Sequence, residues 1–351
     1  MLESLLGSAL MTVHTAPNQS LAMSSNLSTI DSSNDTLPCP EGNFWEWMYT
    51  FQPIYIMAVC IIGIAGNSFV LMVLCLQKGR CTVPELYLGN LAGADLLLLA
   101  GLPFWAVNIA LHYKWPFGEF LCRYVNSVIY MNFYGSIYFL VMVSIDRYFA
   151  LVKVLYHGRI RTLSCAKVNC FIIWMFSLLM SSPSIIFRRV IHVEELNMSA
   201  CLLDYPNHYW ILKMDIVMMV IGFLIPATII SFCTFQILNV LRNNQMQCFK
   251  QASKENKATT LVFAVLLVFV ICWLPFQLLQ FLRIFQFTNI LQGCSLTSAI
   301  SNGSQIATFL ACTNSCINPV LYVLVGKQFR KKARELWVRA KVRKTSGTQS
   351  Q

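Results

Sequence analysis

An acid and a base stand side by side at the end of a long uncharged segment. Asp146 and Arg147, followed by Tyr148, come directly after residues 124–145, which hold no Asp, Glu, Lys or Arg. An ion pair at such a point can hold two helices together until it breaks. Glu255, near the start of a later apolar segment, is a candidate partner for Arg147. The alternative is an ordinary interfacial pair that extends into water. An ion pair that can form and break at this position indicates a conformational switch.

A second acid, Asp95, lies inside an apolar segment, where an ionisable residue is costly and is therefore a functional candidate. Other apolar segments place amides and hydroxyls at a similar depth: Asn67, Asn132, Ser136, Asn314, Ser315 and Asn318. Such side chains suit a sodium ion, because hard cations prefer oxygen ligands. They could instead hydrogen-bond one helix to another without an ion. The residue types leave both interpretations open.

Seven apolar segments must position these groups. The chain is 56% hydrophobic and only 12% charged, whereas a soluble domain holds about a quarter charged residues. The segments are 54–76, 86–111, 124–145, 168–187, 216–241, 258–282 and 299–325. Each can cross a bilayer as a helix, which takes roughly 20 apolar residues. The predicted fold is an all-α membrane protein. A seven-transmembrane helix bundle spans 51–325, between an N-terminal tail (1–50) and a C-terminal segment (326–351).

The net charge of +11 could suggest a nucleic-acid ligand, but its distribution argues against one. Most basic residues fall in the first, third and fifth connections and in the C-terminal tail, whereas the other side is net acidic. The positive-inside rule makes the basic side cytoplasmic. We therefore predict a multi-pass plasma-membrane protein with an extracellular N-terminus and a cytoplasmic C-terminus, with the first membrane helix as its targeting signal.

Cysteines and glycosylation sequons agree with these sides. The cysteines predicted to lie outside are Cys39, Cys122, Cys201 and Cys294. An oxidising exterior favours disulfides, and four cysteines allow three pairings. We favour Cys122–Cys201, which would fix the second outer loop to the third helix, and this leaves Cys39–Cys294. Sequons that require an external position predict glycosylation at Asn18, Asn26, Asn34 and Asn197.

The segment after the seventh apolar stretch is amphipathic. Its apolar residues recur at helical spacing between basic ones: Phe329, Ala333, Leu336, Trp337 and Ala340. This pattern predicts a short helix on the inner membrane surface, attracted by anionic lipid. No nucleophile–base constellation or metal-ligand cluster in the sequence indicates an enzyme. Apart from a possible allosteric sodium ion, no cofactor is expected.

Short motifs in a fixed order identify a resemblance over nearly the whole chain. They are Gly66–Val70, Leu91–Asp95, Asp146–Tyr148, Trp174, Pro226, Cys272–Pro275 and Asn318–Tyr322. In these motifs the sequence resembles the rhodopsin-like class of G-protein-coupled receptors. Longer strings are similar to the bradykinin receptors, most closely to the type 2 form: 85–92, 101–106, 143–148, 240–244, 271–277 and 325–332.

This resemblance implies a receptor for a short basic, kinin-like peptide. Signalling would run mainly through the Gq class of G protein, phospholipase C and calcium, and arrestin would be a further partner. The implied ligand contacts are Trp105, Asn126, Arg188, Trp273, Phe276, Gln277 and Gln305. Trp273 would act as a toggle beneath the ligand. The switch would combine Asp146, Arg147 and Tyr148 with Asn318, Pro319 and Tyr322.

Two alternatives to a kinin receptor remain. One is a receptor for a different peptide hormone, and the other is a decoy that binds peptide without signalling. The intact strings Asp146–Tyr148 and Asn318–Tyr322 argue against the decoy. A light sensor is disfavoured because segment 299–325 has no Lys to form a retinal Schiff base.

The sequence departs from the bradykinin receptors at the outer ends of the sixth and seventh segments. The resemblance implies acidic residues there, facing the basic N-terminus of the peptide, but this chain has Arg283 and Ser301. Like charges placed together cost several kcal/mol. Either other acids supply the missing negative charge, or the ligand differs at this end. The candidate acids are Glu194, Glu195, Asp204 and Asp215. Cys312 also replaces an aromatic residue implied on the pocket side of the seventh segment.

Overall fold

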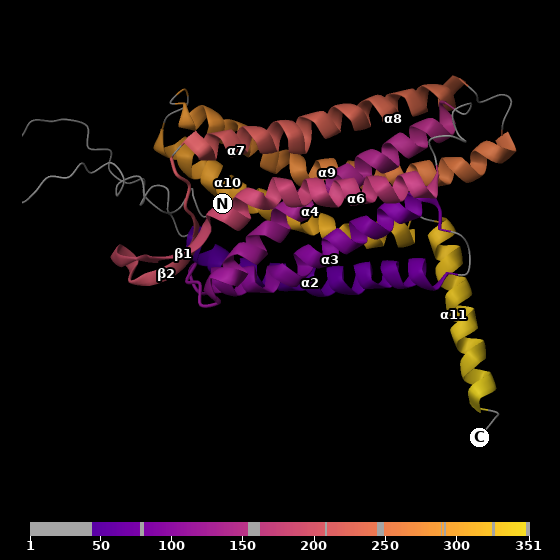
Figure 1. Cartoon of the computed structure of the whole chain (residues 1–351), viewed down its shortest axis with the longest axis horizontal. Helices are drawn as coiled ribbons and strands as arrows, with labels where there is room; N and C mark the ends of the chain where they lie inside the picture. Colours follow the sequence, from indigo (N-terminus) through magenta and orange to yellow (C-terminus); the bar gives the residue numbers. More distant parts are fainter. Residues whose placement is uncertain are drawn as a thin grey trace, which may run out of the picture.

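The structure, a computed structural model, describes residues 44–77, 81–153, 162–207, 209–243, 249–288, 290, 293–324 and 327–348. Long helices run side by side along the longest axis of the molecule (Figure 1). In chain order they begin with α2 (Phe44–Leu76), α3 (Val83–Ala110), α4 (Gly118–Leu151) and α6 (Leu163–Phe187). They continue with α7 (Tyr209–Met219), α8 (Ile225–Asn243), α9 (Phe249–Phe287) and α10 (Cys294–Leu324).

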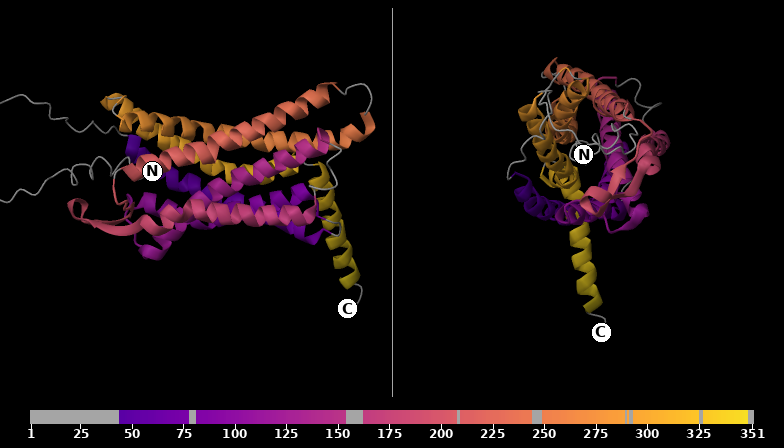
Figure 2. Two further views of the ribbon diagram at one scale, coloured as in Figure 1. Left: turned by 45° about the horizontal axis from the view of Figure 1, so that its top comes forward. Right: turned by 90° about the vertical axis from the view of Figure 1, so that its left-hand side faces the viewer.

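The helices form a closed bundle in which α4 is the most buried span. Helix α2 packs on α3, α3 on α4, α4 on α6 and α8, α9 on α10, and α10 returns to α2 (Figure 2). Among the described residues, six spans are long and apolar enough to cross a membrane, and α7 and α8 form one of them. Helix α10 is not among these six, but it packs on α9 and α2 and so belongs to the same bundle. Backbone polar groups must be satisfied internally in lipid, which is why the apolar segments fold as helices.

Local sequence signals explain two helix starts at one end of the bundle. At α3 the Thr82 backbone N–H donates to Glu85 Oε2 at 3.0 Å, in a capping box followed by proline within the first turn. At α6 the Thr162 hydroxyl accepts from the Cys165 backbone N–H at 3.2 Å. Both caps satisfy backbone donors that have no partner inside their helix.

The fifth span contains an irregular turn that the sequence did not indicate. A π-helical turn, Val220–Leu224, joins α7 to α8, and Pro226 follows at the start of α8. A Cβ atom added to Gly222 would lie 2.3 Å from Phe133 Cε1, so α4 approaches the backbone of this turn closely. Prolines also lie inside α3, α6, α9 and α10, at Pro103, Pro183, Pro275 and Pro319.

A β-hairpin closes one end of the bundle, which we call the hairpin end. Strand β1 (Arg188–Val193) pairs antiparallel with β2 (Met198–Leu203). A 3-10 turn, Glu194–Leu196, and Asn197 with φ of 46° connect them. The Trp115 backbone N–H donates to the Ser199 carbonyl at 2.8 Å and ties the hairpin to the α3–α4 connection.

Helix α11 (Lys327–Thr348) lies at the opposite end, the α11 end, and runs across the axis of the bundle (Figure 1). At 22 residues it is longer than the short helix predicted. Phe329 packs edge-on against Phe69 of α2, with ring centroids 5.9 Å apart. Lys332 forms an ion pair with Glu85 at the start of α3. These contacts fix the first turns of α11 to the bundle, while Trp337 remains exposed.

Candidate functional site

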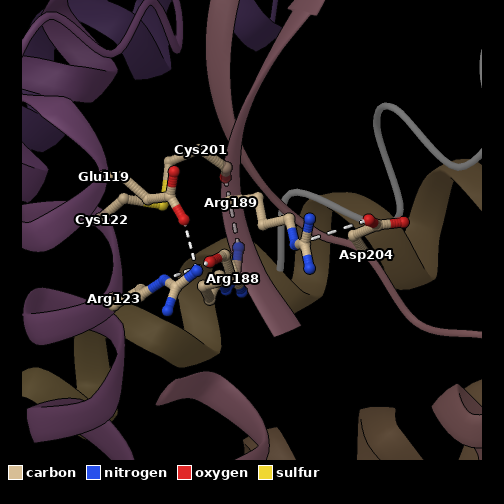
Figure 3. Close-up of polar contacts among 7 residues, drawn as sticks. All are labelled: Glu119, Cys122, Arg123, Arg188, Arg189, Cys201 and Asp204. Carbon is tan, nitrogen blue, oxygen red and sulfur yellow. Dashed lines mark hydrogen bonds and ion pairs between the residues drawn. A yellow bond between two sulfur atoms is a disulfide. The ribbon is translucent and has the colours of Figure 1, made fainter. Parts of the chain in front are cut away.

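A disulfide holds the hairpin against α4. Cys122 and Cys201 are bonded, with Cα atoms 5.7 Å apart, as the sequence predicts (Figure 3). Arg123 Nε donates to the Arg188 carbonyl at 3.1 Å, and the Arg123 side chain also pairs with Glu119. Cys39 lies outside the described residues, so the predicted Cys39–Cys294 bond falls outside them as well. The sequons at Asn18, Asn26 and Asn34 also lie outside, whereas Asn197 is exposed at the hairpin turn.

The hairpin buries a guanidinium beneath itself. Arg188 is only 4% exposed, and its Nη1 donates to the Cys201 carbonyl at 3.3 Å (Figure 3). Among the described side chains no carboxylate pairs with it, and its Nε has no hydrogen-bond partner. A buried cation is costly unless an anion or several acceptors compensate it. Arg188 is therefore suited to receive an anionic group from a ligand.

Other predicted contact residues share this end of the bundle and are buried. Trp105 comes from α3, Asn126 from α4, Gln277 from α9 and Gln305 from α10. Within the described part of the chain, the indole Nε1 of Trp105, both polar atoms of the Gln277 amide and Oε1 of Gln305 have no partner. Buried polar groups are normally satisfied. These groups can hydrogen-bond the backbone or side chains of a polar ligand.

Trp273 lies below these residues in an aromatic cluster. Its ring centroid is 4.6 Å from Phe133, 6.0 Å from Phe269 and 6.1 Å from Phe276. Phe133 also abuts Gly222 in the π-helical turn. Phe133 therefore contacts both Trp273 and the fifth span. Phe133 was missed by sequence reasoning, because an aromatic residue on an apolar helix gives no functional signal.

The middle of the bundle holds the polar cluster predicted around Asp95. The Asp95 side chain is completely buried. Asn132 Nδ2 donates to its Oδ1 at 2.9 Å, and Asn318 Nδ2 donates to its Oδ2 at 3.0 Å. Asn67 Nδ2 donates to the Ser315 carbonyl at 2.8 Å. Within the described residues, further buried oxygens have no partner: Asn67 Oδ1, Ser136 Oγ, Asn314 Oδ1, Ser315 Oγ and Asn318 Oδ1.

At the α11 end, Arg147 bonds to its neighbour on the same helix. Arg147 Nη2 donates to Asp146 Oδ2 at 2.8 Å, and both side chains are less than one-tenth exposed. The pair is thus buried in the bundle and does not extend into water. Tyr148 packs against Phe232 of α8, with ring centroids 5.9 Å apart. The side chains of Glu255 and Tyr322 lie outside the described ones, so the predicted Arg147–Glu255 pair stays a prediction.

An ion pair near the hairpin end was not predicted as such. Arg283 of α9 binds both carboxylate oxygens of Asp215 in α7 through Nη2 at 2.6 Å, and Gln280 Nε2 donates to Asp215 Oδ1 at 3.3 Å. The sequence indicated both charges at this end of their helices. It could not indicate their pairing, which depends on how α7 and α9 are rotated toward each other.

The helices and this arrangement of polar groups define a membrane receptor, and comparison with known proteins identifies its family. Residues 66–322 match the family model described as 7 transmembrane receptor (rhodopsin family). The chain is 49% identical to the B2 bradykinin receptor of Sus scrofa over 310 residues, covering 87% of this chain and 84% of that protein. It is 48% identical to the human (Homo sapiens) B2 bradykinin receptor over 301 residues, covering 85% and 77%.

The B1 bradykinin receptor of Tupaia minor is less similar, at 39% identity over 315 residues, covering 89% of this chain and 90% of that protein. The chain belongs to the rhodopsin family of seven-transmembrane receptors and, within it, to the bradykinin receptors. It is therefore a multi-pass membrane receptor and not an enzyme.

Proposed function

We propose that this protein is a plasma-membrane receptor for a short basic peptide of the bradykinin type. The single observation that carries the proposal is Arg188, a buried guanidinium with no acidic partner among the described side chains. Every peptide with a free C-terminus offers a carboxylate to such a group, and charged hydrogen bonds of this kind are strong. The printed names of the relatives supply the class of peptide.

In this proposal the peptide lies along the unpartnered polar groups of the hairpin end. Its carboxylate binds Arg188, and its backbone bonds Gln277 and Gln305. These lie at the same end of the bundle as Asn126, whose Nδ2 already donates to the Cys122 carbonyl at 2.8 Å. Its apolar residues press toward Trp273 and Phe276, with Trp105 on the α3 side. The hairpin end is then extracellular and the α11 end is cytoplasmic. Exposed Asn197 at the hairpin and the basic residues of α11 support this orientation.

Signalling in this proposal is a population shift. The peptide binds the active arrangement more tightly than the resting one, and only that difference drives the change. Movement of Trp273 displaces Phe133, and α9 pivots near Pro275. Arg147 then exchanges Asp146 for a new contact, and the α11 end opens to admit a helix of a Gq-class G protein. Arrestin would use the same opening, and α11 would rest on anionic lipid.

A sodium ion fits the cluster around Asp95 as an allosteric ligand of the resting state. The residues present suit it, because a buried carboxylate is surrounded by neutral oxygens that lack partners among the described residues. Asp95 would hold the ion together with Ser136, Asn314, Ser315 and Asn318, while Asn132 orients the carboxylate. The ion would supply a positive charge that stabilises the buried Asp95 and favours the resting packing of α3, α4 and α10.

Calcium release in transfected cells tests the proposed function. Cells expressing the receptor would be exposed to bradykinin, its lysyl-extended and des-arginine forms, and a panel of unrelated peptides. A response to the kinins alone, blocked by a Gq inhibitor, is expected. Peptide binding without any G-protein response would indicate the decoy, and a response to an unrelated peptide alone would indicate a different hormone.

A further inference from the structure

The ion pair between Asp215 and Arg283 joins two spans at the hairpin end. Arg283 Nη2 lies 2.6 Å from each carboxylate oxygen of Asp215, and the side chains are 24% and 14% exposed. Gln280 Nε2 adds a third bond to the same carboxylate. Ion pairs that are partly shielded from water are stronger than exposed ones, which contribute little. The Asp215 carboxylate is thus already occupied by a cation that belongs to the receptor.

The pair lies within reach of a peptide that rests on Trp273. Gln280 follows Trp273 by seven residues, which places it on the same face of α9 two turns closer to the hairpin end. Arg283 is one turn further and meets α7 through Asp215. The ten residues from Trp273 to Arg283 rise about 15 Å. An extended peptide covers this distance in about five residues, at roughly 3.3 Å each.

Other acids at the hairpin end do not replace Asp215 among the described residues. Asp204 pairs at 3.8 Å with Arg189, and both side chains are more than half exposed. Glu119 is engaged by Arg123. Glu194 is exposed at the hairpin turn. Lys213, two residues before Asp215, is exposed and lies over the Trp210 ring at 4.8 Å.

We propose that the Asp215–Arg283 pair sets ligand selectivity by making the receptor indifferent to a cationic residue at the peptide's far end. Resting on the proposed kinin-type function, this inference deepens it. A peptide cation that reaches Asp215 must displace Arg283, so one cation is exchanged for another at the same carboxylate. The binding free energy gained when the peptide cation contacts Asp215 and that lost when Arg283 leaves it cancel to first order. A receptor with an uncompensated acid here would instead favour the cationic peptide.

Competition binding with a matched pair of peptides tests this selectivity. One peptide is a kinin with an N-terminal arginine, and the other has citrulline there, which keeps the shape but removes the charge. The selectivity ratio is the affinity for the arginine peptide divided by that for the citrulline peptide. In the wild-type receptor the ratio should stay within about threefold of one, because the two cations compensate.

Variants of the pair should move the ratio in opposite directions. Arg283→Gln frees Asp215 and should raise the ratio about 10-fold, the low end for a partly exposed charge pair. Asp215→Asn removes the carboxylate and keeps the positive charge of Arg283, and it should lower the ratio about 5-fold. The double variant should return to within about threefold of wild type, since the two effects are coupled. Lys213→Gln is the matched control and should leave the ratio within about threefold of wild type.

The outcomes separate this inference from the proposed function. If the wild-type receptor at the cell surface binds neither peptide, the kinin-type function is wrong. If it binds both but prefers the arginine peptide by more than about threefold, the pair does not compensate the ligand charge and the inference is overturned. An unchanged ratio in Arg283→Gln, with the affinity for the citrulline peptide retained, overturns it too. Arg283→Met provides a second neutral variant that must give the same ratio.

Discussion

The buried charge beneath the hairpin and the buried charges deeper in the bundle are compensated in different ways. Near the hairpin, Arg188, Gln277 and Gln305 keep buried polar atoms that have no partner among the described residues. Deeper in the bundle, Asp95 accepts from two amides and Arg147 bonds to Asp146. A buried cation without an anionic partner is suited to an external ligand, whereas charges that the protein itself compensates hold one arrangement until something displaces them. The oxygens around Asp95 that lack a partner within the described part of the chain are neutral, so they suit a small cation and not a peptide. Substitutions in the two regions should therefore affect different properties.

The largest effect on signalling is expected at the α11 end. Arg147→Ala should reduce maximal calcium release below about a tenth of wild type, because the active arrangement loses the residue that changes partner. Peptide affinity at the hairpin end, measured with the G protein uncoupled from the receptor, should stay within about threefold of wild type. Calcium imaging and radioligand binding on the same cells, at matched surface expression, measure both. Calcium release at the wild-type level would remove Arg147 from the switch.

At the hairpin end the expectation is reversed. Arg188→Ala should lower peptide affinity about 100-fold, as expected when one partner of a buried charge contact is removed. Maximal signalling at saturating peptide should persist. Arg189→Ala is the matched control, because the neighbouring side chain is 58% exposed and meets only a distant carboxylate at 3.8 Å. It should change affinity less than about threefold. Equal losses in both variants would show that Arg188 has no special role.

The close contact between Gly222 of the fifth span and Phe133 of α4 leaves no room for a larger side chain. Gly222→Ala would force its new methyl group against the Phe133 ring, and overpacking of this kind costs about 2 kcal/mol. The variant should unfold at a lower temperature in detergent and should signal less at a given receptor occupancy. Gly93→Ala is the control, since nothing lies within 4 Å of the position a Cβ would take. Similar unfolding temperatures for both variants would mean that the Phe133 ring shifts away from the new methyl group at little cost in stability.

A smaller effect is expected from the middle of the bundle. Asp95→Asn removes the only charge described in the polar cluster and should abolish the effect of sodium on agonist affinity, expected to be about 5-fold in the wild type. Affinity would be measured in sodium chloride and in potassium chloride at the same ionic strength, so that general screening cancels. Sodium sensitivity that survives the substitution would leave hydrogen bonding between helices as the role of Asp95.

The sequence predicted the parts of this molecule that depend on length and polarity. The seven apolar segments fold as helices of one bundle, and Asp95, Asn132 and Asn318 met because each lies at the same depth of its helix. The Cys122–Cys201 bond was the favoured one among the pairings that topology and the oxidising exterior allowed, and it is confirmed. Hydropathy predicts how deep in the membrane each residue of a helix lies, and this depth was sufficient to predict these features.

Features that depend on helix rotation or backbone irregularity were missed. The Asp215–Arg283 pair requires α7 and α9 to turn the two charges toward each other, which composition does not specify. The π-helical turn at Val220–Leu224 arises where Gly222 meets Phe133, a contact between distant segments. The hairpin Arg188–Leu203 is short, and its pairing is fixed by the disulfide to α4 as much as by strand propensity.

The central claim is that peptide binding at the hairpin end and G-protein binding at the α11 end are two sides of one equilibrium. The most direct test is agonist affinity in purified membranes with and without added Gq heterotrimer, for wild type and Arg147→Ala. Because coupling is reciprocal, G protein should raise wild-type affinity about 10-fold and leave the variant unchanged. An equal rise in both, or none in the wild type, would contradict the account.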